Sequence, residues 1–330
     1  MTASSLALPV LDDALEAKLR ARMADVEAAL EDAIQSEAPF VTEAARHLMA
    51  AGGKRFRPLL VLLTAEAGEP DIEAVNTAAC VVELTHLASL YHDDVMDEAA
   101  LRRGADSANA RWDNLVAILT GDWLFSKSSE LTARLGAEAV RIQAETFSRL
   151  VEGQILETLG HGDNDPLEHY LRVVAGKTGS LIATSARYGA MFAGVAPEVE
   201  AALTAYGEKV GVAFQLSDDI LDVASDSVES GKTPGTDLRE GVQTLPVLMA
   251  KQSKDPEDAR LLELLESDLT DDELHTETLE LLRKHPAMDE ARGYVLNLAR
   301  EASALLDVLP KGPVREALEA FADLIATRTS

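Results

Sequence analysis

Apolar residues recur every three or four positions along almost the whole chain, which is the spacing of one face of a helix. Leu15, Leu19, Met23 and Val26 show this spacing near the start. No segment alternates apolar and polar residues with period two, so we expect no sheet. The pattern predicts an all-α protein with helices over residues 11–35, 40–51, 56–68, 72–98, 108–134, 137–159, 167–193, 197–224, 242–252, 257–266, 271–284, 287–309 and 313–328.

Two segments interrupt the helical pattern and are typical of loops. Residues 161–166 are short and polar, with Gly and Asp among them. Residues 225–241 are longer and carry three glycines and a proline. Because a long loop in a compact helical domain is usually functional or disordered, residues 225–241 are a candidate lid over a site. The alternative is an ordinary mobile loop.

The composition agrees with a helical protein. The chain has 330 residues, of which 47% are hydrophobic and 4% aromatic. Abundant Ala and Leu with few aromatics favour helices over sheets, and the apolar share is enough for a sizeable core. We expect one large helical domain over residues 1–330. The single cysteine, Cys80, excludes an internal disulfide, and its apolar neighbours predict a small buried residue.

The chain is strongly acidic, with 57 Asp and Glu against 30 Lys and Arg and a net charge of −27. A field of this sign repels nucleic acid and anionic lipid, so neither is an expected partner. The start does not resemble a signal peptide, and no apolar run approaches the ~18–20 residues that span a bilayer. We therefore expect a cytoplasmic protein without stable membrane insertion.

Two short acidic motifs are the main candidates for chemistry. The first comprises Asp93, Asp94 and Asp97, and the second comprises Asp218, Asp219 and Asp222. On a helix, residues i and i+4 share a face, so each motif presents closely spaced carboxylates. Oxygen ligands of this kind suit Mg²⁺, which keeps waters and substrate phosphates as further ligands. Taken singly, each motif could be a solvated acidic face; the apolar stretch that leads into both favours a site.

Basic residues are scarce in this chain, so their grouping is informative. Lys54, Arg55 and Arg57 lie in the segment Gly52–Pro58, at a junction between predicted helices. Two more follow the first acidic motif, and Lys177 and Lys232 each lie beside glycine. Such groups can bind phosphate oxygens, Arg through two parallel hydrogen bonds and Lys as a point charge. The alternatives are a helix C-terminal cation pair for Lys54 and Arg55, and solvated lysines at 177 and 232.

With these motifs, the sequence resembles the trans-prenyltransferase, or polyprenyl diphosphate synthase, family. The resemblance covers about residues 40–250, with motifs in the family's order: GGKRFRP, ELTHLASLYHDDVMD, RRG, GKTGSL, FQLSDDILD and GKTPGTDLREGVQTLP. It implies an all-α bundle around a central cavity, usually a homodimer, that joins isopentenyl diphosphate to an allylic diphosphate. One departure is visible, because Ala105-Asp106 replaces the x-Pro that commonly follows Arg-Arg-Gly. We expect a changed loop shape there, not changed chemistry.

The resemblance also implies roles by position. Isopentenyl diphosphate would contact Lys54, Arg57, His86 and Arg103, with Arg55 beside them. Mg²⁺, about three ions with substrate bound, would be held by Asp93, Asp97, Asp218 and Asp222. The allylic diphosphate would contact Arg102, Lys177, Thr178, Gln215 and Lys232. The residues expected to carry catalysis are Asp93, Asp94, Asp97, Asp218, Asp219, Lys177 and Lys232.

The implied reaction is ionisation of the allylic diphosphate, attack by the isopentenyl double bond, and loss of a proton. Mg²⁺ and the cations would stabilise the departing diphosphate, and an apolar cavity would exclude water. No side chain is an obvious general base; in the family the released diphosphate is the favoured acceptor. For His86 the alternative is a satisfied core histidine, although its place two turns before Asp93 supports the site.

Small residues upstream of the first acidic motif predict a long product. Ser89 and Ala88 lie four and five positions before Asp93, and Thr85 lies eight before it. No bulky residue closes a channel there. A helix rises ~1.5 Å per residue, so the stretch from Asp93 back to Val81 offers roughly 18 Å of depth. This depth predicts a product of about six to ten isoprene units, as in quinone side chains. The alternative is that these residues only permit close helix packing.

Other functions were weighed against this one. A terpene cyclase normally carries an Asn-Ser-Glu-like second motif, which Asp218-Asp219-Ile220-Leu221-Asp222 does not match. A non-catalytic subunit of a heterodimeric synthase tends to lose an acidic motif, and both are intact. A short-chain synthase making farnesyl or geranylgeranyl diphosphate also stays open.

Overall fold

The computed structural model describes residues 12–224 and 234–328, and these residues form two compact units. Unit 1 contains Met1–Phe147, Leu181–Gly207 and Leu306–Ala320, and unit 2 contains Ser148–Ser180, Glu208–Leu305 and Phe321–Ser330. The chain passes between the units within helices, so each unit is assembled from segments far apart in the sequence. A single domain over residues 1–330 stays a prediction.

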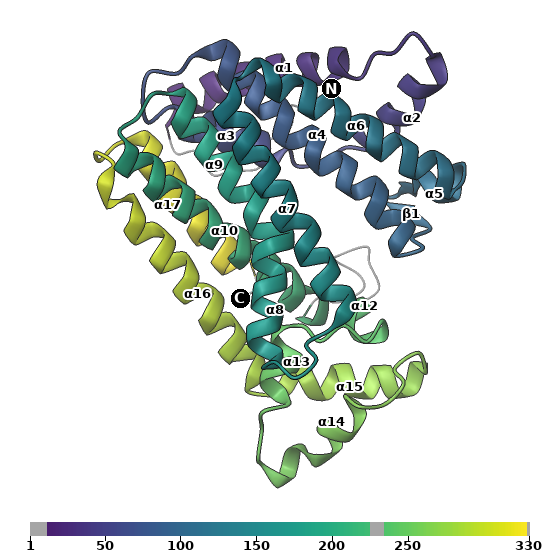
Figure 1. The fold of residues 1–330 in the computed structure, drawn as a ribbon. Coiled ribbons are helices and arrows are strands. Elements are labelled where there is room, and N and C mark those ends of the chain that lie inside the picture. Colours follow the sequence, from purple (N-terminus) through teal and green to yellow (C-terminus); the bar gives the residue numbers. More distant parts are fainter. Residues whose placement is uncertain (1–11, 225–233, 329–330) are drawn as a thin grey trace. The chain divides into compact units, whose positions relative to one another are not determined.

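Unit 1 is built around a long buried helix that ends in the first acidic motif. Helix α4, Ile72–Met96, begins where the Asp71 side chain accepts from the Ala74 amide, the usual way an aspartate caps a helix. Helix α6, Asn114–Arg134, lies alongside α4 (Figure 1). The other elements of unit 1 are α1 Asp13–Ala33, α2 Pro39–Ala50, α3 Phe56–Ala65, α5 Ala108–Arg111, the first part of α7 Ala137–Leu159, α9 Ser180–Phe192, the first part of α10 Pro197–Ala224, a short 3₁₀ turn Leu306–Val308 and the first part of α17 Pro313–Thr327.

A small hairpin follows α4 and corrects the expectation that the chain has no sheet. Strands β1, Leu101–Arg102, and β2, Ala105–Asp106, pair antiparallel with Leu101 opposite Asp106. Arg103 and Gly104 between them both have positive φ, 54° and 78°, which is typical of a two-residue hairpin turn. Two residues per strand are too few to show period two in the sequence, so the pattern missed the hairpin.

The predicted helix over 108–134 is also interrupted. Helix α5 ends at Trp112, whose φ of −118° and ψ of −89° are not helical. Asp113 then caps α6 by accepting from the Val116 amide at 2.8 Å. Aspartate favours such caps because its side chain competes for backbone amides. The interruption therefore follows from a local residue preference that the apolar spacing concealed.

Unit 2 contains an irregular turn where one long helix was predicted over 167–193. Helix α8, Pro166–Val174, runs into a π-helical turn, Ala175–Gly179, before α9 begins. The turn lies against α7: a Cβ at Gly176 would come within 2.9 Å of the Arg149 carbonyl oxygen, and one at Gly153 within 2.7 Å of the Lys177 nitrogen. The remaining elements of unit 2 are α12 Thr236–Arg239, α13 Leu245–Ala250, a 3₁₀ turn Pro256–Asp258, α14 Ala259–Leu264, α15 Asp272–Lys284, α16 Ala287–Leu305 and the later parts of α7, α10 and α17.

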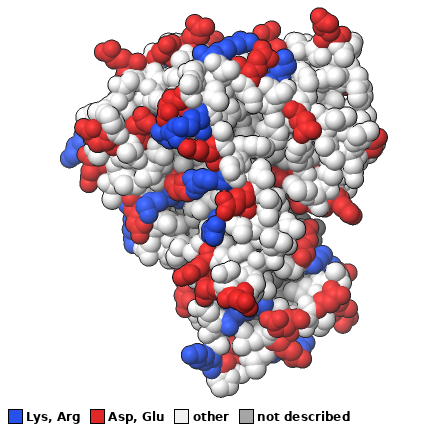
Figure 2. Space-filling view, viewed as in Figure 1, with Lys and Arg blue, Asp and Glu red and all other residues white. Residues whose placement is uncertain are grey.

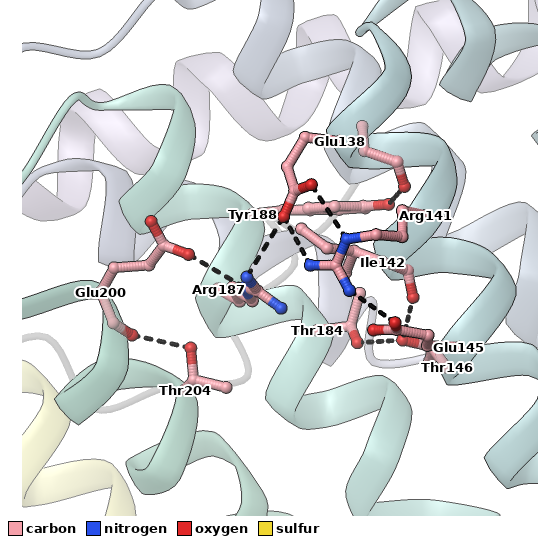
Figure 3. A network of polar contacts seen from close by, with 11 residues as sticks. Glu138, Arg141, Ile142, Glu145, Thr146, Thr184, Arg187, Tyr188, Glu200 and Thr204 are labelled. Carbon is pink, nitrogen blue, oxygen red and sulfur yellow. Dashed lines mark hydrogen bonds and ion pairs between the residues drawn. The ribbon is translucent and has the colours of Figure 1, made fainter. Parts of the chain in front are cut away.

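A polar network joins three helices of unit 1 (Figure 3). Arg187 of α9 lies 2.9 Å from Glu200 of α10 and 3.6 Å from Glu138 of α7. Arg141 also pairs with Glu138 at 2.6 Å. Buried Tyr188 of α9 donates to the Ala139 carbonyl of α7 at 2.7 Å. The network holds α9 and the start of α10 against α7.

The architecture confirms the all-α prediction, apart from the hairpin. Cys80 is 2% exposed, and burial raises the pKa of its thiol to about 12, as expected for a small core residue. Figure 2 shows most Lys and Arg on the visible face next to Asp or Glu, so much of the sparse positive charge is already paired. Within residues 12–224 and 234–328, no helix is both long enough and apolar enough to span a bilayer.

Candidate functional site

The first acidic motif lies at the C-terminal end of α4, where its three carboxylates have different surroundings. Asp97 is the C-cap and is exposed, Asp93 is half-buried one turn earlier, and Asp94 is fully buried. The helix before them is buried almost continuously, as the apolar approach predicted. Asp93 and Asp97 are four residues apart and share a face, so they are the two carboxylates of this motif placed to receive a cation.

Asp94 has a different partner. Its Oδ1 accepts from Arg102 Nε of β1 at 2.6 Å, while its buried Oδ2 has no hydrogen-bond partner among the described residues. Burial raises the pKa of Asp94, and the contact with Arg102 lowers it. Asp94 therefore ties the hairpin to α4 and keeps the Arg102 guanidinium beside the motif.

A cluster of cations surrounds His86, one turn of helix after Glu83. Burial lowers the pKa of His86 well below its ordinary value, and the charges of Arg57, Arg103, Arg102 and Arg55 lower it further. Burial likewise lowers the pKa of Arg57 to about 10, and its Nε is buried without a partner in the described part of the chain. Buried Glu83 offsets part of this positive charge, and an anionic ligand would offset more of it. The structure thus brings Arg57, His86 and Arg103 near one another, and their contact with isopentenyl diphosphate stays a prediction.

Arg55 lies in the same segment but is held by acidic residues. It has a left-handed backbone, with φ of 46°, just before α3. Its guanidinium donates to Glu27 of α1 at 2.6 Å, to Glu83 of α4 at 3.1 Å and to the Met49 carbonyl. Arg55 therefore braces α1, α2 and α4 around the cluster, and its contact with substrate stays a prediction. Glu83, an acid in an apolar helix three positions before His86, could have been noticed from the sequence and was missed.

The glycine pair before Lys54 makes room for another arginine. Gly52 and Gly53 have φ of 96° and 148°, which side chains other than glycine rarely adopt. The Arg103 guanidinium donates to the Leu48 and Gly52 carbonyls, and a Cβ at Gly53 would lie 2.9 Å from it. Lys54 itself is exposed. The Gly-Gly-Lys motif is thus a backbone turn fitted around Arg103.

The residues predicted to set product length divide between two surroundings. The hydroxyl of Thr85 contacts Ser128 Oγ of α6 at 2.7 Å, and Gln143 of α7 donates to the same Ser128 oxygen at 2.6 Å. Ala88 is fully buried, and α6 approaches it closely because residue 121 is glycine. Ser89 is half-buried, four residues from Asp93. Ser89 therefore lies one turn before Asp93, and Thr85, one turn earlier again, is held by its contact with α6.

The second acidic motif lies near the end of α10 in unit 2. Asp218 is exposed, and its Oδ1 lies 2.9 Å from the Arg328 guanidinium of the C-terminal segment. The Asp222 carboxylate accepts from the backbone amides of Thr236 and Asp237 at 3.2 and 3.1 Å. Arg328 also contacts Ser217 and Phe214. Sequence reasoning missed Arg328, because no local pattern relates a lone arginine to a motif 110 positions earlier.

Asp219 is buried and fully hydrogen-bonded. Gln215 Nε2 donates to its Oδ1 at 2.9 Å, and the Tyr170 hydroxyl of α8 donates to its Oδ2. Burial raises the pKa of Asp219 to about 6, against the lowering effect of these two donors. Gln215 in turn accepts from the Thr178 hydroxyl at 3.1 Å. Thr178 and Gln215 were expected at the allylic diphosphate and Asp219 among the catalytic residues; Tyr170 was not expected in the site, and nothing in its sequence neighbourhood indicated it.

Lys177 lies on the π-helical turn and is paired with an acid. Its Nζ lies 2.7 Å from Glu157 of α7, which also accepts from Gln154 at 3.0 Å. Sequence reasoning did not select Glu157. Lys232 and most of the predicted lid over 225–241 lie outside the described residues. An approach of the two acidic motifs to each other also stays a prediction, because they belong to different units.

The donor set fits Mg²⁺ that is shared with a substrate. Across residues 12–224 and 234–328, no group of three or more His, Cys, Asp and Glu side chains is placed to hold a metal alone. Mg²⁺ is usually bound through one or two carboxylates plus substrate phosphates, which is what Asp93 and Asp97 offer. These two residues would hold the ion in unit 1, and Asp218 and Asp222 are the candidates in unit 2.

Comparisons with known proteins agree with this chemistry. A family model described as polyprenyl synthetase matches residues 38–282. The nonaprenyl diphosphate synthase of Mycobacterium tuberculosis strain H37Rv is 49% identical over 96% of this chain and 95% of its own length. A Corynebacterium glutamicum geranylgeranyl pyrophosphate synthase, solved with calcium and isoprenyl diphosphate, has 47% identity and a TM-score of 0.88 over 98% of this chain and 99% of its own. A Rhodobacter capsulatus decaprenyl diphosphate synthase has 34% identity and a TM-score of 0.87 over 96% and 99%.

Proposed function

The chain belongs to the polyprenyl synthetase family, and from that premise we propose that it is a Mg²⁺-dependent prenyltransferase that makes a long all-trans polyprenyl diphosphate. The reaction is the repeated head-to-tail condensation of isopentenyl diphosphate onto an allylic diphosphate. One observation carries the proposal: Arg57 and Arg103 cluster with His86 of α4 at partly buried positions, and α4 is the helix that ends in the Asp93–Asp97 carboxylate pair. A diphosphate would neutralise the first group, and a cation would neutralise the second.

In this scheme the unit 1 cations bind isopentenyl diphosphate. Arg57 supplies a buried donor that lacks a partner in the described residues, and exposed Lys54 supplies a mobile charge. His86 is neutral at pH 7, because burial and the nearby arginines keep the pKa of its imidazole low. A neutral imidazole can donate one hydrogen bond to a phosphate oxygen without adding charge. Bound Mg²⁺ would supply the positive charge that favours departure of the allylic diphosphate.

The bonds change in a simple order. The allylic carbon–oxygen bond breaks and the diphosphate leaves with the electron pair. The isopentenyl double bond then forms the new carbon–carbon bond, and a proton lost from the adjacent carbon restores a double bond. The departed diphosphate is the proposed proton acceptor. Lys177, Thr178, Gln215 and Arg102 are proposed to hold that diphosphate, as is Lys232, which lies outside the described residues.

The product is proposed to be long, although related enzymes differ in this property. The relatives include a nonaprenyl and a decaprenyl diphosphate synthase as well as a geranylgeranyl pyrophosphate synthase. Ala88 and Ser89, five and four positions before Asp93 on α4, are small, and Ser89 is half-buried. These observations favour the long product over the short-chain alternative.

We also propose that the active form is a homodimer. Helix α6 exposes Leu115, Ile118 and Leu119, of which Leu115 is 65% exposed. Apolar residues grouped on one exposed helix face commonly mark an interface. Light scattering of the purified chain tests this directly, and Leu115→Lys with Leu119→Lys should shift a dimer toward monomer. A cytoplasmic location stays a prediction.

A turnover assay tests the function. The purified chain, Mg²⁺, labelled isopentenyl diphosphate and allylic primers of different lengths should give labelled polyprenyl products and released diphosphate. A chelator and Asp93→Ala should each abolish release. Activity that appears only after a second protein is added would support the subunit alternative. Products of three or four units from every primer would support the short-chain alternative.

A further inference from the structure

Tyr170 stands at one end of a chain of hydrogen bonds through unit 2. Its hydroxyl donates to Asp219 Oδ2, Gln215 Nε2 donates to Asp219 Oδ1 at 2.9 Å, and the Thr178 hydroxyl donates to Gln215 Oε1 at 3.1 Å. The chain joins α8, α10 and the π-helical turn. Tyr170 thereby contacts Asp219 of the second acidic motif directly. It is linked to Gln215 and Thr178 only through Asp219.

The direction of these bonds is fixed from the Asp219 carboxylate. An ionised carboxylate has no hydrogen to donate, so the Tyr170 hydroxyl and Gln215 Nε2 are both donors to it. Asp219 then receives a donor on each oxygen. Because the Asp219 carboxylate accepts from Gln215 Nε2, the Gln215 carbonyl oxygen faces Thr178. The orientation of the amide therefore depends on Asp219, whose other oxygen is held by the Tyr170 hydroxyl.

The three carboxylates of the second motif consequently differ in what they can do. Asp219 is 5% exposed and satisfied within the protein, whereas the Asp218 side chain is 46% exposed. A carboxylate that is both buried and hydrogen-bonded on each oxygen is poorly placed to bind an ion, but it can hold its helix turn in a fixed orientation. Asp222 also accepts on each oxygen, from the Thr236 and Asp237 amides, but unlike Asp219 it is only half-buried. Groups of this kind, one step behind the ligands, commonly tune metal affinity.

We propose that Tyr170 is a positioning residue for the transferase: through Asp219 it orients Gln215 and Thr178 toward the allylic diphosphate and keeps Asp218 and Asp222 placed for Mg²⁺. This rests on the proposed function of the chain. The competing explanation is that Tyr170 only fills space beneath α10. The two differ in what loss of the hydroxyl alone should change, because phenylalanine keeps the ring.

Tyr170→Phe is the direct test, and the chain offers matched controls. Tyr188 and Tyr206 are buried tyrosines of unit 1 whose hydroxyls each donate to a backbone carbonyl at 2.7 Å. Tyr188→Phe and Tyr206→Phe therefore remove the same group without touching the acidic motif. We expect Tyr170→Phe to raise the Mg²⁺ concentration for half-maximal rate and the KM of the allylic substrate about 10-fold. The KM of isopentenyl diphosphate should stay unchanged.

A second readout does not depend on turnover. Mg²⁺ with inorganic diphosphate should raise the Tm of the wild-type chain, and this rise should be much smaller in Tyr170→Phe. The two control variants should have lower starting Tm values but a rise equal to that of the wild type. A rise in Tyr170→Phe equal to that of the wild type, or an equal loss in the controls, would overturn the proposal.

A double-mutant cycle with Asp219→Asn separates positioning from packing. If the phenol acts through Asp219, adding Tyr170→Phe to Asp219→Asn should change the Mg²⁺ response little further; additive effects would contradict the proposal. If Tyr170→Phe does not fold, Asp219→Asn is the test instead, because it weakens the same hydrogen bond. An unchanged Mg²⁺ response in Asp219→Asn would then contradict the proposal. If the wild-type chain shows no turnover, the proposed function fails instead. The Tm measurement does not need turnover, so it still tests the role of Tyr170.

Discussion

Arg102 donates from Nε to the buried Oδ1 of Asp94 at 2.6 Å, which separates Asp94 from its neighbour Asp93 in function. Asp94 is fully buried beneath the hairpin, whereas Asp93 is half-buried on the face that also carries Asp97. Adjacent residues on a helix are about 100° apart, so two neighbouring carboxylates can serve different purposes. Asp94 holds the hairpin to α4, and a role of Asp93 in binding a cation stays a prediction.

Alanine substitution should distinguish these two aspartates. Asp94→Ala leaves the Arg102 donor without its acceptor, so we expect a loss of about 1–3 kcal/mol in the free energy of unfolding. Asp93→Ala removes one of the two carboxylates proposed to bind Mg²⁺, so we expect turnover to be lost, while stability should fall by less than in Asp94→Ala because Asp93 is only half-buried. Urea unfolding and the diphosphate-release assay measure the two properties. Equal stability losses in both variants would contradict the division of roles.

The sequence was enough to predict those parts of the fold that depend on local patterns. Apolar spacing located α4 and α10, and the motifs placed Asp93 and Asp218 near their C-terminal ends. The same spacing could not show that Trp112 interrupts a helix, because the residues on both sides still repeat at helical intervals. The π-helical turn at Lys177 was missed for a related reason: it depends on the close approach of Gly153 on another helix.

The partners of the site residues were harder to predict than the residues themselves. Arg328 reaches Asp218 across 110 positions of sequence, and Tyr170 reaches Asp219 across 49. Such contacts arise from packing of α8 and α17 on α10, which no short pattern encodes. Cation groups were also expected to be available to phosphate, yet Arg55 and Lys177 are paired with glutamates.

The Lys177–Glu157 pair should oppose diphosphate binding. Both side chains are partly exposed, 30% and 41%, so the pair is worth only about 0.2–1 kcal/mol. Glu157→Gln frees Lys177 and removes a negative charge, and we expect inorganic diphosphate with Mg²⁺ to bind about two- to five-fold more tightly by calorimetry. Glu152→Gln is the matched control, because Glu152 lies on α7 like Glu157 but pairs with Arg172 of α8. Weaker binding in Glu157→Gln would mean that the glutamate orients Lys177 instead.

Product length should respond differently at two neighbouring positions of α4. Ser89→Phe places a ring on the face of Asp93, so we expect shorter products with little change in Tm. Ala88→Phe should also cost about 1–3 kcal/mol in stability, because Ala88 is fully buried and α6 lies close against it at Gly121. Chromatography of labelled products and thermal unfolding measure the two effects. An unchanged product distribution in Ser89→Phe would show that this face does not line the path of the growing chain.

The imidazole of His86 should make the folded chain sensitive to mild acid. Burial, reinforced by Arg57 and the other nearby arginines, holds the pKa of His86 well below its ordinary value, so the folded protein keeps the ring neutral. The unfolded chain binds a proton near pH 6.5, and the free energy of unfolding therefore falls below that pH, by up to about 1.4 kcal/mol per pH unit from this group. Above pH 6.5 the contribution is constant.

His86→Gln removes the titrating group, so the stability of the wild type relative to His86→Gln should fall by about 1 kcal/mol or more between about pH 7 and about pH 5.5. Urea unfolding at several pH values measures this difference, with His161→Gln at an exposed loop position as the control for losing an imidazole. A difference that stays constant with pH would show that His86 accepts a proton in the folded protein, and it could not then be the neutral hydrogen-bond donor proposed for the diphosphate.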